Sequence, residues 1–237
     1  MHKIDDQLAK VTARIHQAAT AAGRNPQTVQ LIAVSKTQPV QALAEAYAWG
    51  QRAFGENYLQ EALDKQIQLA TREGIESDSL EWHFIGPIQS NKTRPIAEHF
   101  AWVHSVDRLK IAQRLSDQRP PELPPLNICV QVNIDDETTK SGVSLAQLSA
   151  LVAAISQLPR LQLRGLMAIP AATNNPAQQR AAFAKLRVAR DDLNVQGYNL
   201  DCLSMGMSGD MEAAIAEGAT FVRVGTDIFG ARPKVGT

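Results

Sequence analysis

Short apolar runs alternate along this chain with longer runs of helical periodicity. In residues 4–22, apolar side chains recur every three or four positions, which predicts a helix that Gly23 ends. Eight later runs have the composition and length of buried strands. These predicted strands are residues 31–35, 53–55, 82–86, 102–106, 127–133, 163–169, 202–205 and 221–224.

Helical patterns occupy most of the intervals between these strands. They cover residues 40–49, 58–70, 109–116, 145–158, 178–193 and 211–217. Such strict alternation predicts a parallel sheet covered by helices. An open doubly wound sheet is the alternative, but eight strands and the absence of an early GxGxxG turn favour closure.

We therefore predict an α/β fold, a single (β/α)8 barrel of the TIM type that spans residues 1–237 as one domain. The length of 237 residues is close to the roughly 250 typical of such barrels. Residues 226–237 are too few for a full packed helix after the last strand. The extra N-terminal helix is expected to fill that gap in the outer ring.

The composition argues against several classes of protein. The 24 basic and 24 acidic residues balance, so the basic excess typical of nucleic-acid binders is missing. No run of about 20 apolar residues predicts a membrane span, and the charged beginning does not resemble a secretory signal, so a cytoplasmic location is expected. Cys129 and Cys202 lie in apolar segments without metal-ligand spacing, which indicates buried free thiols and no metal site.

Candidate chemistry gathers after the seventh and eighth strands, the two positions where barrels of this type frequently bind phosphate. Residues 204–210 are mostly small and lead into a helix that begins near Met211. Residues 223–227 place Gly225 beside a hydroxyl. Backbone N–H groups of small residues at a helix start can hold an anion, although each segment alone is also an ordinary cap or turn. Together they predict a phosphate cradle.

Lys36 ends the first predicted strand, which neighbours the eighth in a closed barrel. Its amine can therefore reach over the cradle, and desolvation in a partly apolar mouth would lower its pKa. An unprotonated amine forms a Schiff base with an aldehyde, and an aldehyde joined to a phosphate suggests pyridoxal 5'-phosphate (PLP). Arg223 shares a strand face with Gly225 and could donate to the ring nitrogen of that cofactor. A solvated lysine and a salt-bridged arginine are the alternatives.

Several segments together resemble the pyridoxal phosphate homeostasis protein family, whose fold is similar to the barrel domain of alanine racemase. The resemblance rests on residues 31–37, 54–58, 82–86, 165–167, 204–208 and 223–226. It implies a PLP site whose members are Lys36 (Schiff base), Ser208, Gly209, Gly225 and Thr226 (phosphate), Arg223 (pyridine nitrogen), and Asn57 and Ser204 (ring). Gly209 departs from the pattern, since an acidic residue is common there in relatives.

The resemblance also implies a PLP carrier in vitamin B6 and amino-acid homeostasis, not an enzyme. Racemisation needs an acid or base on both faces of the bound substrate, and no tyrosine is an evident partner for Lys36. His83 and Lys140, near strand ends, are candidates for a secondary polar role. A racemase that borrows a base from a dimer partner and a phosphosugar aldolase remain alternatives. The expected partners are PLP and PLP-dependent apo-enzymes, with the chain a monomer or weak homodimer.

Overall fold

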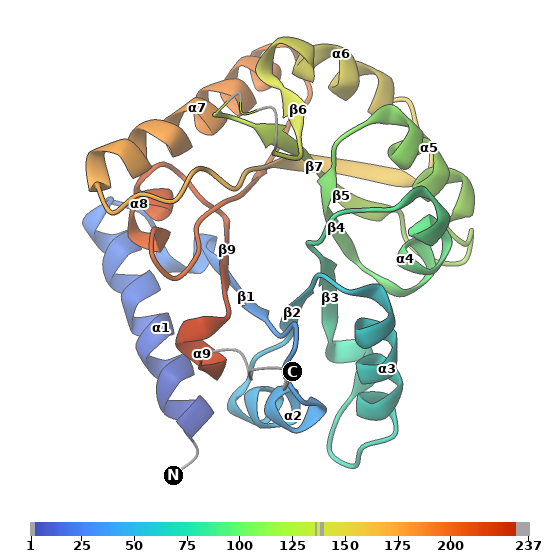
Figure 1. Cartoon of the computed structure of the whole chain (residues 1–237), viewed down its shortest axis with the longest axis vertical. Coiled ribbons are helices and arrows are strands. Elements are labelled where there is room, and N and C mark those ends of the chain that lie inside the picture. Colours follow the sequence, from blue (N-terminus) through green and yellow to red (C-terminus); the bar gives the residue numbers. More distant parts are fainter. Residues whose placement is uncertain (1–2, 136, 138–139, 231–237) are drawn as a thin grey trace.

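A computed structural model describes residues 3–135, 137 and 140–230 of the chain. Eight parallel strands form a closed barrel surrounded by helices (Figure 1), because strand order β4-β3-β2-β1-β9-β8-β7-β5 is completed by pairing of β4 with β5. The eight are β1 (Gln30–Val34), β2 (Ala53–Glu56), β3 (Glu81–Phe84), β4 (Trp102–Val106), β5 (Leu126–Asn133), β7 (Leu161–Met167), β8 (Cys202–Ser204) and β9 (Phe221–Val224). The predicted (β/α)8 barrel is confirmed.

The helices follow the predicted alternation. They are α1 (Lys3–Ala21), α2 (Val40–Trp49), α3 (Leu59–Ala70), α4 (Thr93–His99), α5 (Leu109–Gln118), α6 (Leu145–Ile155), α7 (Pro176–Val195), α8 (Met211–Ala216) and α9 (Thr226–Phe229). The sequence pattern did not predict α4, since seven residues that include Pro95 give too few turns for a visible period. It also did not predict β6 (Val143–Ser144), a two-residue strand that pairs with the end of β5.

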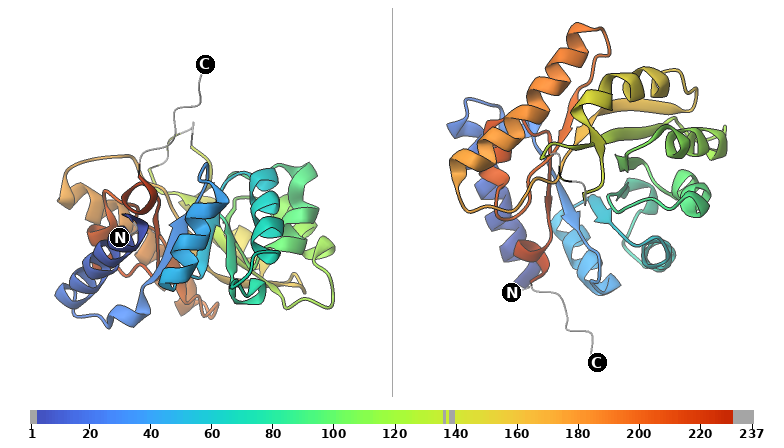
Figure 2. Two further views of the ribbon diagram at one scale, coloured as in Figure 1. Left: turned by 90° about the horizontal axis from the view of Figure 1, so that it is seen from below. Right: turned by 45° about the horizontal axis from the view of Figure 1, so that its top comes forward.

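The N-terminal helix α1 completes the outer ring, as predicted. It packs against α8, α2 and α9, in the gap after the last strand (Figure 2). Leu8, Val11, Ile15 and Ala19 form its buried face, with spacings of three and four residues. The single turn α9 is too short to cover the sheet, so α1 provides the missing layer.

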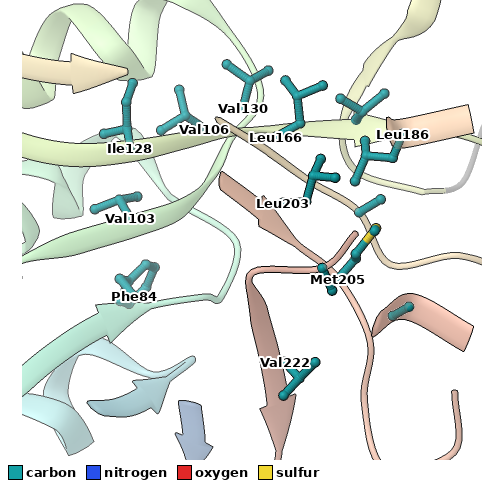
Figure 3. Close-up of a cluster of buried hydrophobic side chains, with 14 of the residues drawn as sticks. Phe84, Val103, Val106, Ile128, Val130, Leu166, Leu186, Leu203, Met205 and Val222 are labelled. Atoms are coloured by element: carbon teal, nitrogen blue, oxygen red, sulfur yellow. The ribbon is translucent and has the colours of Figure 1, made fainter. Parts of the chain in front are cut away.

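The core has two layers because successive strand residues point to opposite faces of the sheet. Between sheet and helices lies an aliphatic layer that includes Val103, Ile128, Leu166 and Leu203 (Figure 3). The barrel interior holds a smaller cluster, made of Ile32, Ala53, Trp102, Cys129, Met167, Cys202 and Phe221. Cys129 and Cys202 are buried free thiols.

The interior also contains buried polar side chains, which a purely structural core would avoid. His83, His104, Ser204 and Arg223 are each at most 4% exposed. They lie on four different inward-facing strands, so the barrel brings together residues that are far apart in the sequence. Among the described helices, none is both long and apolar enough to cross a bilayer.

Candidate cofactor site

A cavity of about 250 Å³ opens at the carboxyl ends of the strands. Of the residues predicted to form the site, those that line it are Lys36, Asn57, Ser208, Gly209, Arg223, Gly225 and Thr226. Ser204, the remaining predicted residue, lies one layer deeper, against Arg223. The fold therefore brings together the first strand and the last two, as the order of elements indicated.

The turn that carries Lys36 has an unusual backbone. β1 ends at Val34, so Lys36 is the second residue beyond the strand. The next residue, Thr37, has a φ of 63°, a left-handed conformation that costs a residue with a branched Cβ about 1–2 kcal/mol. Glu61 of α3 stabilises it, since the Thr37 N–H donates to the Glu61 carboxylate at 2.5 Å.

A buried ion cluster supports the same turn from behind. Lys65 Nζ donates to the Ser35 carbonyl oxygen at 2.7 Å and to Glu56 Oε1 at 2.8 Å, and the Ser35 hydroxyl donates to Glu56 at 2.6 Å. Burial raises the pKa of Glu56, and the nearby Lys65 partly offsets this. Ser35 and Thr37, the neighbours of Lys36 in the chain, are thus hydrogen-bonded to residues of α3 and β2. These bonds fix the position of the Lys36 backbone at the edge of the cavity.

Arg223 is a buried cation at the inner end of the cavity. Its Nη1 donates to Ser204 Oγ at 2.8 Å and its Nη2 to the carbonyl oxygen of Ala168 at 3.0 Å. Burial lowers the pKa of the guanidinium to about 10, so it remains charged at neutral pH. Two of its donor nitrogens are held by the barrel, which orients the planar group toward the cavity.

The loop after β8 is shaped by one glycine. Gly206 has a φ of 95°, and a Cβ built there would lie 2.6 Å from the Ala214 Cβ. Only glycine accommodates both the left-handed turn and the close approach of α8. Within the described part of the chain, the N–H groups of Ser208, Gly209 and Thr226 have no hydrogen-bond acceptor. These N–H groups are available for an anion.

Arg14 of α1 links the two loops from the outside. Its guanidinium donates to the Ser208 carbonyl oxygen at 3.0 Å, to Asp227 at 2.6 Å and to Glu212 at 2.8 Å. The hydrogen bond to Glu212 and the adjacent carboxylates raise the pKa of Arg14 despite partial burial. The N-terminal helix therefore sets the separation of the two predicted phosphate loops.

Asn57 and two isoleucines form another part of the cavity wall. The Asn57 side-chain oxygen is buried and accepts no hydrogen bond from the described residues. Gly86 permits its position, since a Cβ there would overlap the Asn57 carbonyl oxygen. Ile85 and Ile169 supply apolar surface. A buried polar atom with no partner is costly, so Asn57 indicates that a ligand donor belongs beside it.

Some cavity residues escaped the sequence analysis. They are Val34, Gln38, Ile85, Ile169, Met207 and Gly230. Val34 ends β1, Ile85 directly follows β3 and Ile169 lies two residues beyond β7, so a position at or just past a strand end is the signal that could have identified these three. His83 and Lys140 do not line the cavity: His83 lies deep in the barrel, and Lys140 forms an ion pair with Asp135 at 2.7 Å.

Comparison with known proteins identifies the family and the fold. Residues 7–233 match the family model of the alanine racemase N-terminal domain. The chain is 64% identical over 232 residues to the pyridoxal phosphate homeostasis protein of Pseudomonas aeruginosa, covering 98% of this chain and 97% of that one. The Escherichia coli protein of the same name is 55% identical, with 98% of each chain covered.

Among solved structures, PipY of Synechococcus elongatus with PLP bound is 40% identical, with a TM-score of 0.80 over 96% of this chain and 100% of that one. An alanine racemase of Clostridium difficile, 15% identical with a TM-score of 0.71, shares the fold across 97% of this chain and 58% of its own. Full-length coverage at more than half identity settles the family. The chain belongs to the pyridoxal phosphate homeostasis protein family.

Proposed function

We propose that this protein binds PLP as a Schiff base on Lys36 and serves vitamin B6 and amino-acid homeostasis as a carrier of that cofactor, without catalytic turnover. One observation carries the proposal. A single cavity joins the Lys36 side chain, the Arg223 guanidinium and backbone donors from two loops. The PLP-bound structure of the relative PipY supports the choice of ligand.

The residues present fit the chemistry of PLP. The unpaired N–H groups of Ser208, Gly209 and Thr226 suit a phosphate, and Arg223 suits a pyridine nitrogen that accepts a hydrogen bond. The orphaned Asn57 oxygen offers an acceptor beside the ring. When bound, PLP supplies an aldehyde conjugated to an electron-withdrawing ring. The Lys36 amine joins the aldehyde carbon and one water molecule is released.

The composition of the cavity wall supports a carrier over a racemase. Of the described residues that line it, Lys36 and Arg223 alone can titrate. Racemisation needs a second proton donor and acceptor opposite the lysine. Arg223 does not fill that role, because it keeps its proton at neutral pH and only donates hydrogen bonds. A racemase would therefore need a base from outside this chain.

The lysine assignment is tested by reduction and mass measurement. After borohydride treatment of the PLP-loaded protein, we expect one covalent increment, on the peptide that contains Lys36, and a visible absorption band before reduction. Lys36→Ala should lose both, whereas Lys110→Ala, a change at an exposed lysine of α5, should keep both. An unchanged band in Lys36→Ala would show that the amine is elsewhere.

Turnover is tested separately with the loaded protein and free amino acids in deuterium oxide. The carrier proposal expects no exchange at the α-carbon above the rate of PLP alone. Exchange at an enzyme-like rate, of about one turnover per second or more, would replace the carrier proposal with the racemase.

A further inference from the structure

A continuous line of hydrogen bonds crosses the barrel interior. It begins at Glu81, the first residue of β3, whose side chain is 38% exposed at the amino-terminal mouth of the barrel. Glu81 bonds His83 Nε2 at 2.8 Å, and His83 Nδ1 lies 2.9 Å from His104 Nε2. His104 Nδ1 lies 2.8 Å from Ser204 Oγ, which accepts from Arg223 at 2.8 Å. The line ends in the cavity.

The two ends of this line determine the direction of every bond in it. Arginine can only donate, and an ionised Glu81 can only accept. With both histidines neutral, one arrangement leaves no donor facing a donor. His83 Nε2–H donates to Glu81, His104 Nε2–H donates to His83, and the Ser204 hydroxyl donates to His104. Each ring therefore carries its proton on Nε2, and Ser204 keeps its lone pairs for Arg223.

The surroundings keep the two rings neutral and in place. Burial lowers the pKa of His83, and burial together with the neighbouring His83 and Arg223 lowers the pKa of His104 well below its usual value. Trp102 and Phe221 pack against both histidine rings with centroid distances between 5.4 and 5.8 Å, which restricts rotation of the rings. Hydrogen bonds from His83, Gln30 and Trp102 hold the pKa of Glu81 low despite burial, so the line keeps its anionic end.

We propose that the relay, meaning Glu81, His83, His104 and Ser204, positions Arg223 for the cofactor by linking its guanidinium to a remote negative charge. Polarisation along successive hydrogen bonds makes Ser204 Oγ a stronger acceptor, which holds Arg223 in its charged form and fixed orientation. The four are positioning residues, because none of them lines the cavity. Burial lowers the pKa of Arg223, and electrostatic interactions with Asp210 and Cys129 partly offset this effect, but neither residue forms a hydrogen bond with the guanidinium.

The tautomers can be measured in the protein without cofactor by long-range ¹H–¹⁵N correlation of the imidazole rings at pH 7. For both buried histidines we expect a protonated Nε2 and an unprotonated Nδ1. A proton on Nδ1 of either ring, or a doubly protonated ring, would overturn the proposed direction. The measurement needs no variant, so a failure to fold cannot obscure it.

The coupling itself is tested with Glu81→Gln, which keeps the shape of the side chain and removes its charge. The amide can donate as well as accept, so the ¹⁵N signals of His104 should change together with those of His83, although Glu81 does not contact His104. Glu122→Gln makes the same charge change at an exposed site before β5, on the same face of the barrel, and should change neither ring. Unaltered His104 signals in Glu81→Gln would refute the coupling.

The consequence for the cofactor rests on the proposed function, because it assumes that Arg223 meets the ring nitrogen of PLP. Equilibrium titration should show PLP affinity falling roughly two- to fivefold in Glu81→Gln, with a displaced visible band, and remaining unchanged in Glu122→Gln. Unchanged affinity and band alongside altered His104 signals would refute the link to the cofactor. Loss of the covalent increment and of the visible band in Lys36→Ala is measured independently of Glu81→Gln, so the proposed function and this inference can fail separately.

Discussion

Lys65 is a buried lysine on α3, the helix behind the candidate cofactor site. Its amine donates to the Ser35 carbonyl oxygen in the turn before Lys36 and forms an ion pair with Glu56. We predict that Lys65→Met lowers the free energy of unfolding by about 3–5 kcal/mol, because it leaves the Glu56 carboxylate buried without its cation. Urea denaturation measures the change. Lys110→Met, at an exposed position of α5, should change stability by less than about 0.5 kcal/mol.

Double substitution separates charge from packing at this cluster. Lys65→Met combined with Glu56→Gln removes both charges, so it should recover part of the loss. If Lys65→Met and Lys110→Met have equal stability, the cluster does not stabilise the fold.

Two glycines of the loop after β8 provide a matched pair. Gly206→Ala should lower Tm by several degrees, since it forces a side chain into a φ of 95° and against Ala214. Gly209→Ala should change Tm little, because its Cβ would meet no atom within 4 Å. Calorimetry of the two variants is the measurement. Equal losses would mean that the loop does not depend on Gly206 for its shape.

At the level of elements, α1 is more than a cover for the last gap in the ring. Its Arg14 holds the two predicted phosphate loops at a fixed separation through Ser208, Glu212 and Asp227. We predict that Arg14→Met weakens PLP binding roughly tenfold, the equivalent of one charge-assisted hydrogen bond. Pyridoxal, which lacks the phosphate, should bind with nearly unchanged affinity.

Lys10→Met provides the control for this prediction, because it removes one positive charge from an exposed position of the same helix. It should leave both affinities as they are, by absorbance titration. If Arg14→Met weakens PLP and pyridoxal equally, α1 acts on the fold in general and not on the phosphate loops.

For the molecule as a whole, the buried histidines predict a dependence of stability on pH. The pKa values of His83 and His104 in the folded protein lie below the ordinary 6.5. Just below pH 6.5, these two histidines therefore bind protons in the unfolded chain but stay neutral in the folded protein. Stability should therefore fall as pH decreases through 6.5, by at most about 1.4 kcal/mol per pH unit for each histidine. Glu56, whose pKa is raised, acts in the opposite direction at lower pH.

Urea denaturation between about pH 5.5 and 7.5 measures this slope, and a matched pair of variants isolates its source. His104→Gln should remove about half of the histidine contribution, whereas His99→Gln, at an exposed position of α4, should retain all of it. Equal slopes in the two variants would rule out the buried ring of His104 as the cause.

The sequence determined the barrel and most of the candidate site. Eight apolar runs that alternate with helical ones favour a closed parallel barrel over an open sheet, and parallel strands bring their carboxyl ends to one mouth. That is why Lys36 and the segments 204–210 and 223–227, which lie about 170 to 190 residues further along the chain, could be expected at one mouth from their positions in the order of elements. Short elements such as α4 were missed because they contain too few turns to show a period.

Only the tertiary structure revealed what supports the site. The partners of Arg223, the ion cluster behind Lys36 and the contact of Arg14 with both loops join residues whose sequence separation carries no signal. The buried line from Glu81 to Ser204 depends on which strand faces point inward and on distances of about 3 Å. Hydrophobic periodicity records that a position is buried, whereas the partner of a buried polar atom is fixed only when the chain closes around it.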